Sequence, residues 1–172
     1  MGKMDRPYNV CLSGFYFPSK LTPEIVSIQE RVIDRTQSFE QHDEIELLLV
    51  TGGSGKIEVN EFSYDLKSGS LIALYLYHIH RIVPSSEQPI HTVSIHIPYS
   101  TYLFLLTAPN VTVQGDSHDL LHAVLDDISF GRFLELVEQI RSNSLTTPIK
   151  NMYELGCIAE MFGLLMQIAG TE

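Results

Sequence analysis

Glutamate and histidine alternate along one short stretch of the chain. Glu40, His42, Glu44 and Glu46 occupy every second position and precede an apolar run that ends in glycines. On a β-strand, alternate side chains point to the same face, successive members being about 6–7 Å apart. Imidazoles and carboxylates are ligands of transition metal ions, and carboxylates also accept hydrogen bonds from hydroxyl groups. The row therefore indicates a metal site, a pocket for a small polar molecule or the solvated face of a strand.

Burial of this row would require compensation. Neighbouring carboxylates repel one another and lose hydration, so a cation, an arginine or a hydroxyl-rich ligand must offset their charge. The alternative is a strand whose glutamates face water while Ile45, Leu47 and Leu49 form the core. We favour a pocket that binds its ligand without a metal.

Short strands are expected from about residue 24 to residue 97, since β-branched or alternating segments are separated there by glycine and asparagine. Several strands at this spacing predict an antiparallel sandwich or barrel. The expected strands cover residues 24–33, 43–50, 55–60, 62–66, 70–76 and 91–97.

Helices are expected after about residue 115. Apolar residues recur at steps of three and four from Phe130 to Ile140, which predicts an amphipathic helix with Ser129 as its N-cap. A second helix is expected from Pro148 to Ala169, with Thr147 as its N-cap.

The second helix has two apolar stripes, and one stripe is enough to cover a barrel. We assign that role to Ile158, Met161, Leu165 and Ile168. A second stripe favours a symmetric helix-helix contact between two subunits, although a helix fully buried within one monomer is the alternative. The expected dimerisation residues are Met152, Leu155, Ala159, Phe162 and Met166.

Composition excludes several classes of function. The 172 residues include 11 Lys and Arg against 21 Asp and Glu, a net charge of -10 that would repel a nucleic acid. Cys11 and Cys157 are too far apart in sequence to suggest a disulfide framework or a zinc knuckle. The apolar stretches are too short for a membrane span, and the N-terminus has no signal-peptide core. We expect a cytoplasmic protein with no membrane partner.

Two motifs resemble those of cupins. Glu40-x-His42-x3-Glu46-x6-Gly53 resembles the first cupin motif, with glutamate where the first histidine usually stands. Gly69 followed by SLIALYLYHI and His80 has the spacing of the second motif, without its usual Pro-x-Gly turn. The segment from residue 42 to 82 is similar to the ligand-binding domain of AraC-type transcriptional regulators, and the resemblance covers roughly residues 24–170.

This resemblance implies a mainly β fold, a double-stranded β-helix (cupin jelly-roll) barrel followed by two C-terminal α-helices. The implied divisions are an N-terminal arm at residues 1–23, an effector-binding barrel at 24–115 and a helical dimerisation and linker region at 116–172. The arm either packs over the barrel mouth or adds an edge strand.

The implied function is a regulatory effector-binding and dimerisation domain that is not an enzyme. It would bind a small polar molecule, and the known ligands of the family favour a sugar. It would act on DNA only through a helix-turn-helix domain, and the sequence stops at Glu172 before any such segment. The alternative is a free-standing metal-dependent cupin enzyme of the dioxygenase, isomerase or decarboxylase class.

The candidate effector-binding residues supply carboxylates, imidazoles, guanidinium groups and aromatic rings. They are Glu40, His42, Glu44, Glu46, Tyr64, Tyr75, His80, His96, Arg31 and Arg81. We expect no cofactor. The alternative is one transition metal such as Mn, Fe, Ni or Zn, held by Glu40, His42, Glu46 and His80.

Overall fold

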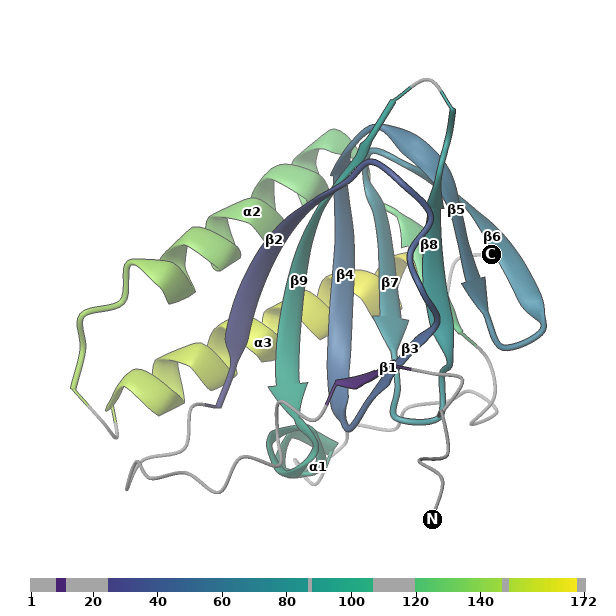
Figure 1. Ribbon diagram of the computed structural model, residues 1–172. Coiled ribbons are helices and arrows are strands. Elements are labelled where there is room, and N and C mark those ends of the chain that lie inside the picture. Colours follow the sequence, from purple (N-terminus) through teal and green to yellow (C-terminus); the bar gives the residue numbers. More distant parts are fainter. Residues whose placement is uncertain (1–8, 12–24, 87, 107–119, 147–148, 170–172) are drawn as a thin grey trace, which may run out of the picture.

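Two five-stranded sheets face each other in the computed structural model, which describes residues 9–11, 25–86, 88–106, 120–146 and 149–169 (Figure 1). The helix-covered sheet has the strand order β10 (Leu121–Val124), β7 (Ser70–Leu74), β4 (Glu44–Gly52), β9 (Ile90–Pro98) and β2 (Ser27–Ile33). The facing sheet has the order β1 (Asn9–Cys11), β3 (Glu40–His42), β8 (His80–Pro84), β5 (Ser54–Val59) and β6 (Phe62–Lys67). Pairing is antiparallel throughout except between β1 and β3.

Three helices complete the described structure: α1 (Tyr99–Leu106), α2 (Asp127–Arg141) and α3 (Ile149–Ala169). Figure 1 shows α2 and α3 lying across one face of the helix-covered sheet. The mainly β jelly-roll barrel with two C-terminal helices that we expected is confirmed. No helix in the described part of the chain is long and apolar enough to span a membrane.

Strand β4 is buried on both of its faces. Ile45, Leu47 and Leu49 belong to a hydrophobic cluster that includes buried residues of α2 and α3. Leu48 and Val50 point the other way and belong to a second cluster inside the barrel, together with residues of the facing sheet. The even-numbered face, which begins with Glu44 and Glu46, therefore lines the barrel interior and is not a solvated strand face.

The alternating stretch is divided between the two sheets. Glu40 and His42 lie on β3 and pair within the facing sheet, whereas Glu44 begins β4 in the helix-covered sheet. The prediction of one continuous strand was therefore wrong, because the chain crosses between the sheets at Asp43. The sequence pattern also missed β8, β10 and α1, and β10 falls in the range that we expected to be helical.

The helix starts differ in detail from expectation. Asp126 is the N-cap of α2, and its carboxylate accepts a hydrogen bond from the backbone N–H of Ser129 at 2.7 Å. Ser129 therefore lies inside the first turn, so its assignment as N-cap was wrong. Thr147 and Pro148 lie outside the described residues.

The N-terminal segment is described only at Asn9–Cys11, which form the edge strand β1 beside β3. This supports the edge-strand alternative for those three residues. The rest of residues 1–23 lies outside the described part.

Helix α3 uses one stripe as expected. Ile158, Met161 and Leu165 are fully buried in the cluster beneath the helices, which confirms that this stripe covers the barrel. Met152, on the other stripe, is 66% exposed, so α3 is not fully buried among the described residues.

Candidate functional site

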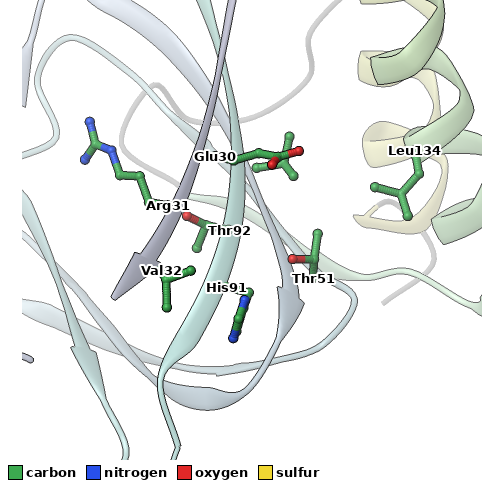
Figure 2. A pocket seen from close by; sticks show the side chains of 8 residues that line it. Glu30, Arg31, Val32, Thr51, His91, Thr92 and Leu134 are labelled. Carbon is green, nitrogen blue, oxygen red and sulfur yellow. The ribbon is translucent and has the colours of Figure 1, made fainter. Parts of the chain in front are cut away.

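A cleft of about 490 Å³ lies beside β2 (Figure 2). It is lined by Glu30, Arg31, Val32, Thr51, His91, Thr92, Val93 and Leu134. Thr92 is buried, and its Oγ1 has no hydrogen-bond partner within the described ranges. Most of the cleft lies on the helix side of the sheet, since Leu134 belongs to α2 and Val93 packs in the cluster beneath the helices. The Arg31 guanidinium points to the opposite side, where it contacts Glu40, so the polar groups of Arg31 and Thr92 are offered to a small molecule from the barrel side of the sheet.

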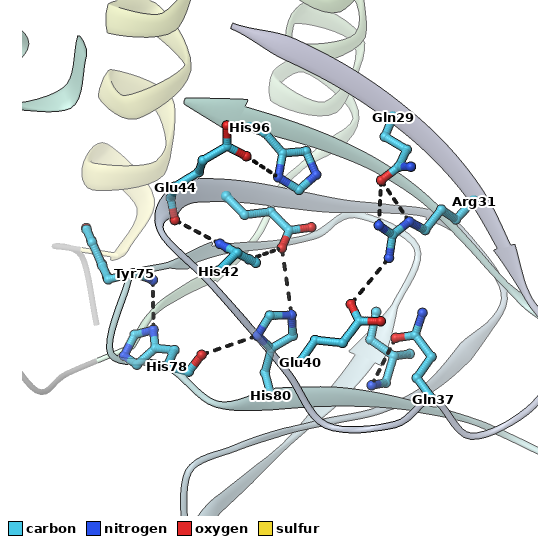
Figure 3. A network of polar contacts seen from close by, with 12 residues as sticks. Gln29, Arg31, Gln37, Glu40, His42, Glu44, Tyr75, His78, His80 and His96 are labelled. Carbon is cyan, nitrogen blue, oxygen red and sulfur yellow. Dashed lines mark hydrogen bonds and ion pairs between the residues drawn. The ribbon is translucent and has the colours of Figure 1, made fainter. Parts of the chain in front are cut away.

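A polar cluster occupies one part of the barrel interior (Figure 3). His42 ends β3, Glu46 lies on β4, His80 begins β8 and His96 lies on β9, and each of the four is at most 8% exposed. Strand register explains their convergence, because Glu46 lies directly opposite His96 in the β4–β9 pair. The cluster thus combines three imidazoles and a carboxylate from both sheets.

The Glu46 carboxylate is the common partner in this cluster. Its Oε2 lies 2.9 Å from His42 Nε2 and 3.7 Å from His80 Nε2. Burial alone would raise the pKa of Glu46, but the hydrogen bond from His42 and the nearby imidazoles His96 and His80 hold that pKa well below its usual range. Burial likewise opposes charge on His42, yet its contacts with Glu46 raise the pKa of the imidazole.

Two imidazoles are oriented by backbone carbonyl groups. His42 Nδ1 lies 2.9 Å from the carbonyl oxygen of Glu44, and His80 Nδ1 lies 3.4 Å from that of His78. A carbonyl oxygen can only accept, so Nδ1 carries the hydrogen in both rings. Both Nε2 atoms are consequently directed at Glu46.

His96 is the least satisfied member of the cluster. Its Nδ1 lies 3.5 Å from Glu44 Oε2, and neither ring nitrogen has a hydrogen-bond partner among the described residues. One ligand atom from each of His42, Glu46 and His96 lies within 4.8 Å of the other two. The geometry therefore suits a metal ion.

Glu40 is placed apart from this group, although the metal-site alternative named it as a ligand. It lies directly opposite His80 in the β3–β8 pair, and its Oε2 is 3.6 Å from the Arg31 guanidinium. Arg31 Nε also donates to Gln29 Oε1 at 2.9 Å. Glu40 and Arg31 thus form a second polar group along β2, next to the cleft.

Other expected ligand-binding residues lie elsewhere. Arg81 follows His80 on β8 and therefore faces the opposite way, where it binds Glu58 at 2.7 Å and stacks over Phe39. Its assignment to the barrel interior was wrong for this reason. Tyr64 packs against the apolar cluster inside the barrel and contacts His122.

Tyr75 belongs to an aromatic cluster beside α1. Its ring contacts Tyr77, His78 and Tyr102, and burial and Tyr102 raise its pKa. The Tyr75 N–H donates to His78 Nδ1 at 3.0 Å. Burial, with the adjacent His80 and His42, lowers the pKa of His78 to about 4, so this imidazole is neutral at pH 7. We assign Tyr75 a packing role.

A family model for the AraC-like ligand-binding domain matches residues 23–155. The chain belongs to this family. No curated protein sequence matches the chain.

Solved structures of ToxT from Vibrio cholerae share the fold of this AraC-like domain. An apo variant from strain SCE256 has a TM-score of 0.65 and 13% identity, covering 86% of this chain and 58% of that chain. ToxT from O395 bound to (E)-4-(8-methylnaphthalen-1-yl)but-3-enoic acid has a TM-score of 0.60 and 13% identity, covering 84% and 57%. Wild-type ToxT bound to an unsaturated fatty acid has a TM-score of 0.56 and 16% identity, covering 85% and 54%. The AraC-like domain therefore spans a little over half the length of these structures.

Sequence reasoning missed Thr92 as a buried polar residue of the AraC-like domain and Gln29 as the exposed residue that accepts a hydrogen bond from Arg31. The signal for Thr92 was the alternation in the segment IHTVSIHI, which puts Thr92, Ser94 and His96 on one face. Gln29 shares a strand face with Arg31, but polar residues also alternate on solvated edge strands, so this pattern was ambiguous.

Proposed function

We propose that this effector-binding regulatory domain senses a small polar molecule inside its barrel and signals through its helices to a partner subunit. The observation that supports the proposal most is the buried polar cluster around Glu46, which lies on one face of a sheet whose other face packs against α2 and α3. A site in this position can influence helix packing without catalysing a reaction. In a longer regulator, the DNA-binding part would lie outside this chain, and a cytoplasmic location remains a prediction.

The charges in the barrel favour an uncharged, hydroxylated effector such as a sugar. Glu40, Glu44 and Glu46 lie on the interior side, where Arg31 is the nearest guanidinium group, so a carboxylate ligand would meet like charge. The ToxT ligands named above are acids. We therefore propose that this domain binds a different chemical class, whose hydroxyl groups contact Arg31, Glu40 and Thr92.

Adjacent residues of β2 provide a route from the site to the helices. Arg31 contacts Glu40 inside the barrel, whereas Glu30 points to the other face and pairs with Arg141 of α2 at 2.6 Å. A ligand that reorients Arg31 would shift the same strand that anchors the end of α2. This physical continuity supports a coupling between effector and helix packing.

Arg31→Ala is expected to weaken binding of a matching hydroxylated ligand by about 10–100-fold, because a hydrogen bond from a charged group contributes about 1.5–3 kcal/mol. Ligands would be found by screening sugars and polyols for a rise in melting temperature, since binding to the native state stabilises it. Arg35→Ala removes an exposed guanidinium from the loop that follows β2 and should leave affinity unchanged. Equal losses for both variants would contradict the assignment of Arg31.

We also propose that α3 pairs with its symmetry mate through Met152, Leu155, Ala159, Phe162 and Met166. Met152 and Ala159 are exposed, whereas Leu155, Phe162 and Met166 are partly buried. Phe162 contacts Tyr102 within the monomer, so its substitution would also disturb the subunit fold. Met152 is the cleaner probe.

Met152→Glu is expected to weaken the dimer at least about tenfold, because a charge buried at the contact without a partner is costly. Sedimentation velocity across a concentration series measures the shift toward monomer. Phe62→Glu is a matched control, since Phe62 is also 66% exposed but lies on β6, away from α3. A wild-type chain that sediments as a monomer at every concentration would refute the dimer.

A further inference from the structure

The arrangement around Glu46 requires a positive centre between the His42 ring nitrogen and the carboxylate oxygen that it faces. His42 donates its Nδ1 hydrogen to the Glu44 carbonyl, so a neutral His42 presents the bare lone pair of Nε2 to Glu46. That lone pair lies 2.9 Å from the anionic carboxylate oxygen. Two acceptors at this distance repel unless a proton or a metal ion lies between them.

The same arrangement is repeated at His80. Its Nδ1 faces the His78 carbonyl and its Nε2 faces the same oxygen of Glu46. An imidazole whose second nitrogen is held by a carbonyl or a carboxylate is the arrangement found in metal-ligating histidines. Two rings have this arrangement, whereas His96 Nδ1 has only a 3.5 Å contact with Glu44 Oε2 that is not a hydrogen bond.

His96 provides a second observation, which does not depend on the contacts of His42 and His80. It is a buried imidazole with neither nitrogen hydrogen-bonded among the described residues, and it is directed at the Glu46 group. An unsatisfied buried polar group is costly, and coordination of a metal ion by Nε2 would remove that cost. The ring centres of His80 and His96 lie 5.3 and 5.6 Å from that of His42, which places all three rings around the carboxylate.

We infer that this domain binds one divalent transition metal ion through His42, His80, His96 and Glu46, with His96 taking the place that the cupin motif gives to Glu40. Glu40 is unsuited because its carboxylate is paired with Arg31, whereas His80 Nε2 lies 3.7 Å from Glu46 Oε2. His96 reaches the group from β9, through its register with Glu46. Three imidazoles and one carboxylate suit Zn²⁺, Co²⁺, Ni²⁺ or Cu²⁺.

This inference deepens the proposed function, since it rests on the same barrel site, and it gives that site two separate parts. The metal ion would occupy the histidine group, and Arg31, Glu40 and Thr92 would remain for the effector. A metal ion would also compensate the buried charge of Glu46 and could bind an effector hydroxyl directly.

Metal binding would be measured on the untagged full chain, first stripped with a chelator. Titration with Co²⁺ should show visible absorption bands that saturate at about one equivalent, and Zn²⁺ should displace the Co²⁺. His96→Ala should weaken Co²⁺ binding by more than about 100-fold, because even the loss of an outer hydrogen-bond partner costs 10–100-fold. Glu40→Gln should bind Co²⁺ as the wild type does.

His91→Ala is the matched control, because His91 is an exposed histidine on the other face of the same strand. Thermal melting of each metal-free variant shows whether it folds. Electron paramagnetic resonance of the Cu²⁺-loaded wild type needs no variant and should report three imidazole nitrogens. A Cu²⁺ ion held instead by Glu40, His42, Glu46 and His80 would show two imidazole nitrogens.

The absence of a saturable site in the wild type would overturn the inference, as would two nitrogen ligands or loss of binding in Glu40→Gln with retention in His96→Ala. The effector proposal is tested separately, by ligand-induced stabilisation of the chelated protein and its dependence on Arg31. The metal-binding proposal and the effector-binding proposal can therefore each be disproved without disproving the other.

Discussion

Phe133→Ala is expected to lower the free energy of unfolding by about 3–5 kcal/mol. Phe133 is 0% exposed and heads the largest fully buried side chains in the described structure. It joins α2 to the same hydrophobic cluster as Ile45 and Leu47 of β4, so its loss leaves a cavity between the helix and the sheet. Because domains of this size are stable by only about 5–15 kcal/mol, chemical denaturation followed by circular dichroism should resolve the change easily.

Ile128→Ala is the control for this change. Ile128 lies on the same helix but is 84% exposed, so its truncation should alter stability by less than about 0.5 kcal/mol. The helix and the sheet should also unfold in one transition, because one cluster joins them. A cost below about 1 kcal/mol for Phe133→Ala, or separate transitions, would show that α2 is only loosely attached. The helices could not then report the state of the barrel.

The strand pattern predicted the elements better than it predicted their exposure. Ile45, Leu47 and Leu49 were assigned to a core from their alternation, and the structure confirms this. The same alternation cannot show that the opposite face is also buried, since that depends on a second sheet packed against it. Burial of Glu44 and Glu46 could not be read from the local sequence for this reason.

The site was predicted in part because its geometry is partly local. His42 and Glu46 are close in sequence, and the cupin spacing brings His80 into the same group, so these three were named together. The proposed replacement of Glu40 by His96 depends on the crossing of the chain at Asp43 and on the register of β4 with β9. Register is a long-range property, and a shift of one residue would turn each side chain to the opposite face.

Arg81 shows the same dependence on strand direction. It was assigned to the pocket as a source of hydrogen-bond donors, but it follows His80 directly on β8, and neighbours on a strand face opposite ways. The structure places Arg81 against Glu58 and Phe39 on the outer face. Proximity in sequence was therefore misleading here, whereas a spacing of two residues would have been informative.

The last residue of the first cupin motif, Gly53, has a structural role that can be tested directly. It links β4 to β5, where the chain passes from the helix-covered sheet to the facing sheet, and its φ angle is 78°. An added Cβ atom would lie 1.9 Å from the carbonyl oxygen of Pro89. Both the positive φ and this close backbone approach require glycine.

Gly53→Ala is expected to lower the free energy of unfolding by about 2–5 kcal/mol, since a left-handed conformation costs about 1–2 kcal/mol for alanine and relief of the clash adds about 1–3 kcal/mol. Gly131→Ala is the matched control, because Gly131 lies within α2 and an added Cβ there meets nothing within 4 Å. This control should stabilise the protein by about 0.5–1 kcal/mol, because alanine favours a helix interior over glycine. Denaturation of the two variants side by side measures effects of opposite sign. If Gly53→Ala were tolerated as well as Gly131→Ala, the glycine of the motif could not be explained by the crossing between the sheets.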